Sequence, residues 1–233
     1  MSEHIVTSFD QDLERIDKLI RDMGELGAEM VADATRALLS SDEPLAQRIV
    51  SEDVIMDARQ RELDDAAIAL IAKRQPMAQD LRTVIGAIRI AADLERIGDL
   101  AKNVAKRVPS AGGSTIPKPL SGSLQTMSEL VLAQVRRAIA MYASRDAEGL
   151  VSLREDDERI DIQYTSLFRE LLTYMMEDPR NITSCTHLIF CAKNLERIGD
   201  HVTNIAENGY YTLTGQQLPA TRPKADETAA AQG

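Results

Sequence analysis

A five-residue motif, Glu-Arg-Ile-Gly-Asp, occurs twice in this chain, at 95–99 and again at 196–200. In each copy, one acidic residue begins the motif and another ends it four positions later. Because an α-helix turns about 100° per residue, side chains four positions apart lie on one face, one turn apart. A helical motif therefore presents two carboxylates side by side. Like charges at this spacing destabilise an isolated helix by roughly 0.2–0.5 kcal/mol, and a bound cation could offset that repulsion.

A second pair of acidic residues precedes each motif. Asp53 and Asp57 lie four positions apart in the first half, and Asp157 and Asp161 recur at the matching place in the second half. This recurrence is informative because a chain this acidic also contains accidental pairs. The four carboxylates of each half could line one groove and bind a cation there. The alternative is that they form a solvent-exposed acidic stripe, which is present in both halves only because the chain arose by duplication. The candidate metal ligands are Asp53, Asp57, Glu95, Asp99, Asp157, Asp161, Glu196 and Asp200.

The position of the first motif on its helix favours a site. An apolar stripe of Leu81, Ile85, Ile88 and Ala92 runs directly into Glu95, so we expect the carboxylates to continue a packing surface. Burying ionised carboxylates without partners is very costly. Sets of carboxylates without thiolates suit hard or borderline cations. We therefore expect divalent or ferric ions, with iron, manganese, magnesium, calcium and zinc as candidates.

Other kinds of chemistry find less support in the sequence. His201 follows Asp200 but points about 100° away from it on a helix, so a surface or supporting role is expected. No Glu has a His three residues later, which is the signature of di-iron carboxylate enzymes. A phosphate-binding glycine loop, a Cys/His cluster and a nucleophile elbow are also missing from the sequence. Cys185 and Cys191 are expected to be buried thiols. We assign no catalytic residue and no organic cofactor.

Long helices must position the acidic pairs, and the composition favours them. Hydrophobic residues make up 44% of the chain but aromatic residues only 3%, with no tryptophan. A core of Leu, Ile, Val, Met and Ala is typical of packed helices, and apolar residues recur at helical spacing. The chain is therefore predicted to be all-α. We expect helices over about 8–39, 42–74, 76–108, 124–142, 147–176 and 178–211.

The repeated motifs divide the chain into two tandem, pseudo-symmetric three-helix bundles, at 1–108 and 124–211. The stretch 109–123 is rich in Pro, Gly and Ser and is predicted to be the linker. The segment 212–233 is polar and of low complexity, which predicts disorder.

The overall charge limits the classes of partner. A formal charge of -10 and a pI near 4.9 disfavour nucleic acid and anionic lipid as general partners. The first residues lack the basic and apolar regions of a secretory signal. No apolar run approaches the ~18 residues of a membrane span. We therefore expect a soluble cytoplasmic protein that reaches a membrane only through partners.

Three features together resemble the PhoU family of regulators of bacterial phosphate uptake and signalling. They are the doubled Leu-Glu-Arg-Ile-Gly-Asp, the Gln75-Pro76 followed by Asp80-Leu81-Arg82, and the Asn204-Ile205-Ala206-Glu207 after the second motif. The resemblance covers about His4 to Tyr211. One departure is that the second half has Asn181-Ile182-Thr183 where the first has Asp80-Leu81-Arg82, so the role of that motif need not be symmetric.

The resemblance implies two similar three-helix bundles whose acidic motifs bind multinuclear metal clusters. It also implies a non-enzymatic adaptor that contacts the ATPase subunit of the phosphate ABC transporter and a sensor histidine kinase, and restrains both when phosphate is plentiful. We expect a metal-binding negative regulator of phosphate homeostasis that forms a homodimer. The alternative from another class is a carboxylate-bridged metal enzyme, a hydrolase or an oxidase, on a helical bundle.

Overall fold

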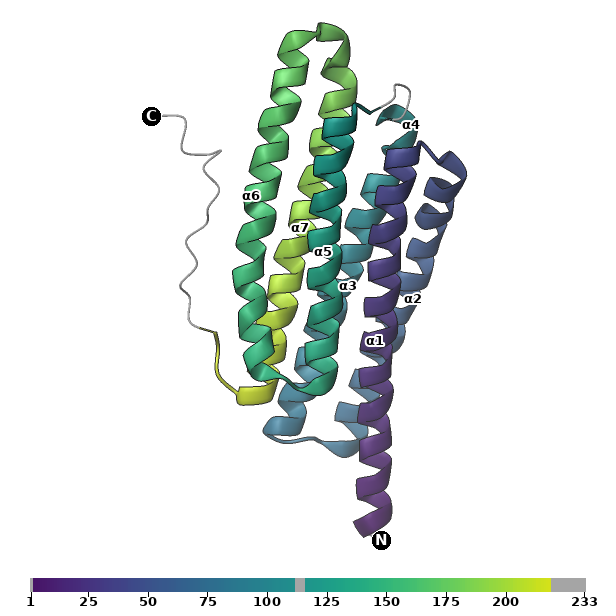
Figure 1. Ribbon diagram of the computed structural model, residues 1–233. Helices are drawn as coiled ribbons and strands as arrows, with labels where there is room; N and C mark the ends of the chain where they lie inside the picture. The colour runs from purple at the N-terminus through teal and green to yellow at the C-terminus, as the bar shows by residue number, and fades with distance from the viewer. Residues whose placement is uncertain (1, 112–115, 219–233) are drawn as a thin grey trace.

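The computed structural model describes residues 2–111 and 116–218 of the 233-residue chain, and this part is almost entirely α-helical (Figure 1). No strand occurs among the described residues, and none of their helices combines the length and apolarity that a membrane span requires. The all-α prediction is confirmed. The long helices are α1 (Ser2–Ser40), α2 (Glu43–Arg74), α3 (Gln79–Ala105), α5 (Lys118–Ser144), α6 (Ala147–Glu177) and α7 (Ile182–Thr214); α4 (Val108–Ala111) and a 3-10 turn at Pro179–Asn181 are short.

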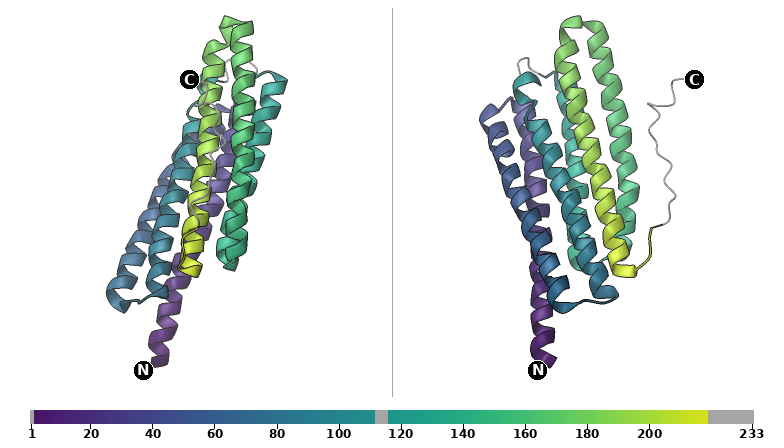
Figure 2. Two further views of the ribbon diagram at one scale, coloured as in Figure 1. Left: turned by 90° about the vertical axis from the view of Figure 1, so that its left-hand side faces the viewer. Right: turned by 180° about the vertical axis from the view of Figure 1, so that it is seen from behind.

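The six long helices form one elongated bundle made of two trios, α1 to α3 and α5 to α7 (Figures 1 and 2). The trios pack against each other through α3 with α7 and through α1 with α5. In Figure 1, α1 rises from the N-terminus while α5 descends, and α3 and α7 likewise run in opposite directions. The two repeats therefore face each other in antiparallel orientation, with the α2–α3 turn at one end and the α6–α7 turn at the other.

Local sequence signals set several helix ends. The Asp42 side chain accepts a hydrogen bond of 2.9 Å from the backbone N–H of Leu45 and caps α2, and Pro44 lies in the first turn, where proline is tolerated. Asp146 caps α6 in the same way through Gly149, at 2.9 Å. Gln75 ends α2 in the left-handed conformation.

Two helix starts differ by six residues from the sequence-based expectation, and those of α3 (Gln79) and α7 (Ile182) by three and four. The first helix begins at Ser2 and not at Ser8, because serine is only mildly unfavourable inside a helix and does not by itself mark a helix start. Helix α5 begins at Lys118, inside the stretch 109–123 expected to be linker, because Pro119 is tolerated in a first helical turn. Residues 112–115 of that stretch, and 219–233 of the segment expected to be disordered, lie outside the described residues.

The core is continuous between the two trios. Apolar residues from all six long helices belong to one buried cluster, which includes Ile49, Met56, Leu63, Ala67 and Leu70 of α2. Two polar contacts also cross between α1 and α5: Ser128 Oγ donates to Thr35 Oγ1 at 2.9 Å, and Tyr142 Oη donates to Asp17 Oδ1 at 2.8 Å. The bundle is thereby a rigid frame for the middle of α3 and α7, which carry the repeated motifs.

Candidate functional site

The acidic pairs of the first repeat lie on the adjoining helices α2 and α3. Asp53, Glu95 and Asp99 are each partly buried, whereas the side chain of Asp57 is 42% exposed and lies 4.0 Å from Arg61. The Nζ atom of Lys102 lies 2.6 Å from Asp53 Oδ2 and 2.5 Å from Asp99 Oδ1. The side chain of this lysine is itself mostly buried. An ammonium group of the chain therefore joins the two carboxylates that face each other across α2 and α3.

The electrostatics of this first cluster follow from that arrangement. Burial raises the pKa of Glu95, and the negative charges of Asp99, Asp57 and Asp53 raise it further, although Arg96 lowers it. Burial alone would also raise the pKa of Asp99, but the hydrogen bond and charge of Lys102, together with Arg96, lower it overall. The four carboxylates of the first repeat are thus close enough to interact, and they share the positive charge of their basic neighbours.

The second repeat buries its carboxylates more deeply. Asp157 on α6 is 1% exposed and Glu196 on α7 is also buried, while Asp161 and Asp200 are half-buried. Lys193 Nζ lies 2.8 Å from Glu196 Oε1, and the Lys193 side chain is 43% exposed.

The glycine inside the second motif brings a further polar group to this cluster. A Cβ atom at Gly199 would lie 2.8 Å from Asp157 Oδ1 and 3.3 Å from Gln134 Oε1 of α5. Asp157 and Gln134 therefore meet at the bare backbone of Gly199. In the first repeat, the same position at Gly98 is met by Met56 and Met30.

Three side chains near the clusters were not identified from the sequence as parts of a site. Lys102 could have been found, because it follows Asp99 by three positions and so shares its helix face. Thr203 holds the same place after Asp200. Gln134 gave no signal, because its position depends on how α5 packs against α7.

The structure corrects one expectation, about an apolar stripe on α3, and refines another, about His201 on α7. The stripe thought to continue into Glu95 is not a packing surface: Leu81 and Ala92 are exposed and Ile85 and Ile88 are only partly buried. The face of α3 that carries Ile97 is the fully buried one. His201 does not join the acidic cluster of α7, and its Nδ1 lies 3.0 Å from Asp93 Oδ1 on α3, between the repeats.

The donor set of the clusters fits a hard cation in its chemistry, because it consists of carboxylate oxygens. Its arrangement fits less well. Among residues 2–111 and 116–218, no three Asp, Glu, His or Cys side chains are grouped so that they could hold a metal ion together. In the first repeat, the Lys102 ammonium occupies the place between Asp53 and Asp99 that a cation would take.

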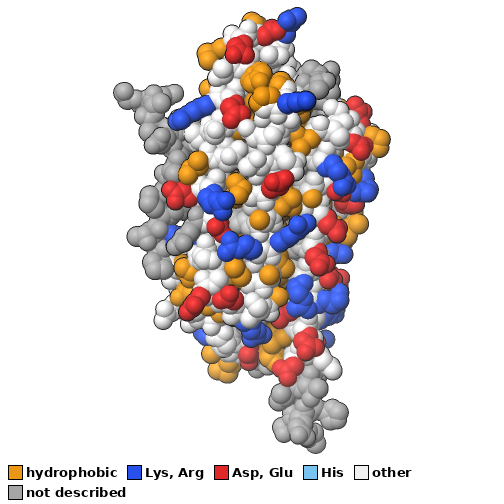
Figure 3. Space-filling model, in the orientation of Figure 1, with side chains coloured by type: hydrophobic (Ala, Val, Ile, Leu, Met, Phe, Trp, Pro, Cys, Tyr) orange, Lys and Arg blue, Asp and Glu red, His pale blue; other side chains and the backbone are white. Residues whose placement is uncertain are grey.

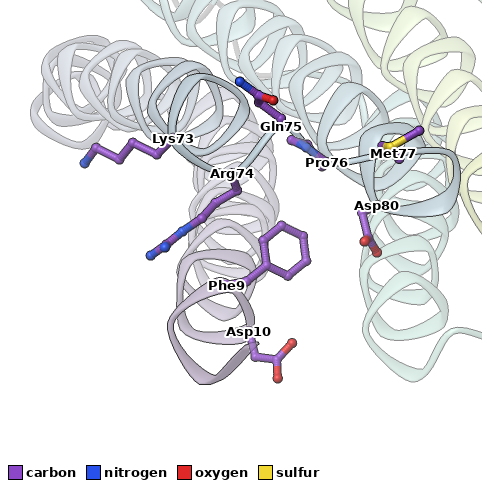
Figure 4. Close-up of a pocket in the computed structure, with 8 residues that line it drawn as sticks. All are labelled: Phe9, Asp10, Lys73, Arg74, Gln75, Pro76, Met77 and Asp80. Atoms are coloured by element: carbon purple, nitrogen blue, oxygen red, sulfur yellow. The ribbon is translucent and has the colours of Figure 1, made fainter. Parts of the chain in front are cut away.

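A pocket of about 610 Å³ lies at the α2–α3 turn (Figure 4), and none of its lining residues belongs to either acidic cluster. Phe9 of α1 and Pro76 of the turn contribute apolar surface, and the neighbouring Met77 is 80% exposed. Basic and acidic residues complete the wall; the lining residues are Phe9, Asp10, Lys73, Arg74, Gln75, Pro76, Met77 and Asp80.

Comparison with known protein families returns a match to the PhoU domain at residues 20–108 and again at 124–209. A phosphate-specific transport system accessory protein PhoU homolog of Rhizobium meliloti (strain 1021) is 58% identical over 225 residues, which cover 97% of this chain and 95% of the relative. The phosphate-specific transport system accessory protein PhoU of Escherichia coli (strain K12) is 34% identical over 218 residues, or 94% of this chain and 90% of the relative.

Solved structures resemble the whole bundle. The crystal structure of PhoU from Pseudomonas aeruginosa matches with a TM-score of 0.84 at 36% identity, over 89% of this chain and all (100%) of that one. The phosphate transport system regulatory protein PhoU from Streptococcus pneumoniae matches with a TM-score of 0.83 at 28% identity, over 91% and 99% of the two chains.

Proposed function

The chain belongs to the PhoU family, and from this premise we propose that it is a regulatory accessory protein of phosphate uptake. The observation that carries the proposal is similarity over nearly the full length to a phosphate-specific transport system accessory protein, at 58% identity. Both copies of the repeated domain are present, in a fold shared with two other PhoU structures. The similarity therefore extends over both repeats and not over one motif.

We propose that the protein acts by binding other proteins in the cytoplasm. Its partners are the ATPase subunit of the phosphate transporter and the sensor histidine kinase, which it restrains when phosphate is plentiful. The surface supports such a role at the two ends of the bundle, where Met77 and Met176 are exposed at the α2–α3 and α6–α7 turns. On the face of Figure 3, by contrast, acidic and basic side chains are interspersed among small apolar patches. Exposed methionines adapt to varied partner surfaces.

Metal binding through the acidic clusters is a second part of the proposal. The supporting observation is the chemistry of the donors: carboxylates of α2 and α3 lie together in the first repeat, and Asp157 of α6 and Glu196 of α7 are buried in the second. A bound divalent or ferric cation would supply positive charge that neutralises the clustered carboxylates. The residues that would hold it are those on α2 and α3, Asp53, Asp57, Glu95 and Asp99, and those on α6 and α7, Asp157, Asp161, Glu196 and Asp200.

An affinity purification from cross-linked cells, grown at high and at low phosphate, tests the adaptor role. The transporter ATPase and the sensor kinase should co-purify with the tagged protein, and more strongly at high phosphate. Met77→Lys should reduce recovery of at least one partner without unfolding the chain, because the side chain is 80% exposed. Met176→Lys is the matched variant at the opposite end of the bundle. Comparing the two variants shows which end each partner contacts.

The proposal fails if neither partner is recovered at either phosphate concentration while both are present in the membranes. The alternative, a metal enzyme, is tested on the same preparation. Turnover in a panel of hydrolase and oxidase assays with metal-loaded protein, lost on replacing Glu196 by Gln, would favour the enzyme.

A further inference from the structure

The C-terminal half of α7, which packs against both α3 and α6, borders another pocket (Figure 1). Its volume is about 580 Å³, which is within the range of small-molecule sites. None of its lining residues belongs to the acidic clusters, and two of them carry guanidinium groups although the chain as a whole has a formal charge of -10. The lining residues come from both repeats and from the segment after α7; they are Arg89, Arg154, Glu207, Asn208, Tyr211, Gln217 and Leu218.

Two opposite charges line this pocket without meeting. Arg89 and Glu207 form no ion pair with each other, and neither has an ion-pair partner elsewhere in the part of the chain that the structure describes. Arg154 does interact with other groups of the chain. A guanidinium has several N–H donors, however, so it can hold an internal partner and an oxyanion at the same time. Arginine binds phosphate and carboxylate oxygens through paired hydrogen bonds, so an oxyanion in the pocket would give Arg89 its missing partner.

Neutral donors complete the polar lining. The Tyr211 hydroxyl and the Gln217 amide can each donate a hydrogen bond to an oxyanion. Asn208 uses one N–H for the backbone oxygen of Asn204, at 3.0 Å, and its amide group has a second. Arginine, tyrosine, asparagine and glutamine are among the side chains that contact phosphate oxygens in protein–DNA complexes. The pocket therefore combines charged and neutral donors of the types that bind phosphate groups.

The equivalent place in the other half of the bundle is filled by the chain itself. Counting from the repeated motifs, Phe190 takes the place of Arg89. Likewise, Arg107 takes the place of Asn208. The Cζ atom of Arg107 lies 4.2 Å from the centroid of the Phe190 ring, so this guanidinium stacks on an aromatic side chain. Arg107 Nη1 also lies 3.2 Å from His187 Nδ1. The arginine at this second place is therefore held internally, whereas Arg89 lines an open pocket.

The Glu207 carboxylate restricts which oxyanion suits the pocket. A carboxylate repels an anion that carries no proton, but it can accept a hydrogen bond from one that does. Phosphate keeps at least one proton at neutral pH, whereas sulfate keeps none. A phosphate ester retains its last proton less readily, because its second pKa is about 6. The combination of Arg89 with Glu207 therefore favours phosphate over sulfate.

We propose that this pocket binds a protonated phosphate group. Arg89 and Arg154 hold its charged oxygens, and Glu207 accepts the hydrogen bond that its P–OH group donates. The site joins the two repeats, because Arg89 belongs to α3 while the other lining residues belong to α6, α7 and the segment that follows α7. The proposal goes beyond the regulatory role above and does not depend on it, since side chains of this chain alone bind the ligand.

The test is isothermal titration calorimetry of the full-length protein at neutral pH, with inorganic phosphate, sulfate and AMP as separate ligands. A chelator in the buffer ensures that no anion is bound through a metal ion. Phosphate should bind more tightly than sulfate. Arg89→Gln should weaken phosphate binding by about tenfold or more, because charged hydrogen bonds are lost. Arg136→Gln removes the same charge from an exposed position of α5 outside the pocket, so this matched control should bind phosphate as the wild type does. Glu207→Gln should bind sulfate and phosphate with similar affinity, because the repelling carboxylate is gone.

Three results would overturn the proposal: a wild-type protein that binds no phosphate, a wild-type protein that binds sulfate as tightly as phosphate, or an Arg89→Gln variant that is helical by circular dichroism and binds phosphate unchanged. The AMP titration identifies the source of the phosphate group. Weaker binding of AMP than of inorganic phosphate supports free phosphate as the ligand, and tighter binding supports a phosphate ester in the same site. The regulatory role is tested separately, by co-purification of the transporter ATPase and the sensor kinase.

Discussion

Replacing the two equivalent glycines by alanine should change stability in opposite directions. Alanine in place of glycine inside a helix gains about 1 kcal/mol. At Gly98, the new Cβ would lie 3.2 Å from Met56 Cγ and 3.6 Å from Met30 Sδ. Methionine side chains rearrange readily, so much of the gain should remain. We expect Gly98→Ala to stabilise the protein by about 0.5 kcal/mol.

At Gly199, the same Cβ would lie only 2.8 Å from Asp157 Oδ1 and 3.2 Å from Ile160 Cδ1. Asp157 is fully buried, so its carboxylate cannot move out into solvent. Overpacking of this kind costs about 1–3 kcal/mol, which exceeds the gain in helix propensity. We expect Gly199→Ala to lower the free energy of unfolding by about 1 kcal/mol.

Thermal and urea unfolding in chelator-containing buffer, followed by circular dichroism at 222 nm, measures both effects. A difference of about 1.5 kcal/mol between the two variants corresponds to roughly 3–6 °C in Tm for a chain of this size. Equal changes at the two positions, or a stabilising Gly199→Ala, would refute the reasoning, because the packing of Asp157 against the Gly199 backbone would then not be as described.

Three further predictions concern charge and burial. Lys102→Met should lower the free energy of unfolding in chelator buffer by about 1–3 kcal/mol, because it leaves the Asp53 and Asp99 carboxylates without their shared ammonium; urea titration measures this, and an unchanged midpoint would contradict it. Folding raises the pKa of Glu95 above its ordinary value of 4.5. Protonated Glu95 therefore contributes fully to stability below about pH 4.5, and this contribution is lost as the pH rises through the raised pKa of the folded state. Glu95→Gln should therefore match wild type near pH 4 and exceed it at pH 8, and the reverse order in urea midpoints would disprove the assignment. Burial raises the pKa of Cys191 to about 12, so this thiol should react with a disulfide reagent at pH 8 only after unfolding in urea, and rapid labelling of the native protein would contradict its burial.

The long helices could be predicted from the sequence because their apolar spacing is regular and several ends carry strong signals. Asp42 and Pro44 define the start of α2 through local chemistry alone. The packing between the repeats could not be predicted in the same way. The contact of His201 with Asp93 requires that α3 and α7 lie antiparallel, and no local pattern specifies which faces of two distant helices meet.

The sequence predicts which acidic residues pair up in each repeat, but it does not predict the charges that surround them. The recurrence of acidic pairs places Asp53 with Asp99, and the structure brings these two together across α2 and α3. The ammonium of Lys102 lies between them, although the sequence analysis did not assign this residue to the site. The depth of burial was misjudged along Leu81 and its stripe, because an apolar track on a helix does not show whether a neighbour covers it.

The most direct test of the regulatory role measures a phosphate-starvation reporter in a deletion strain grown with plentiful phosphate. The account predicts that the reporter stays switched on without this protein and is repressed again when the wild-type chain is restored. Normal repression in the deletion strain, at the level of the parent, would contradict it.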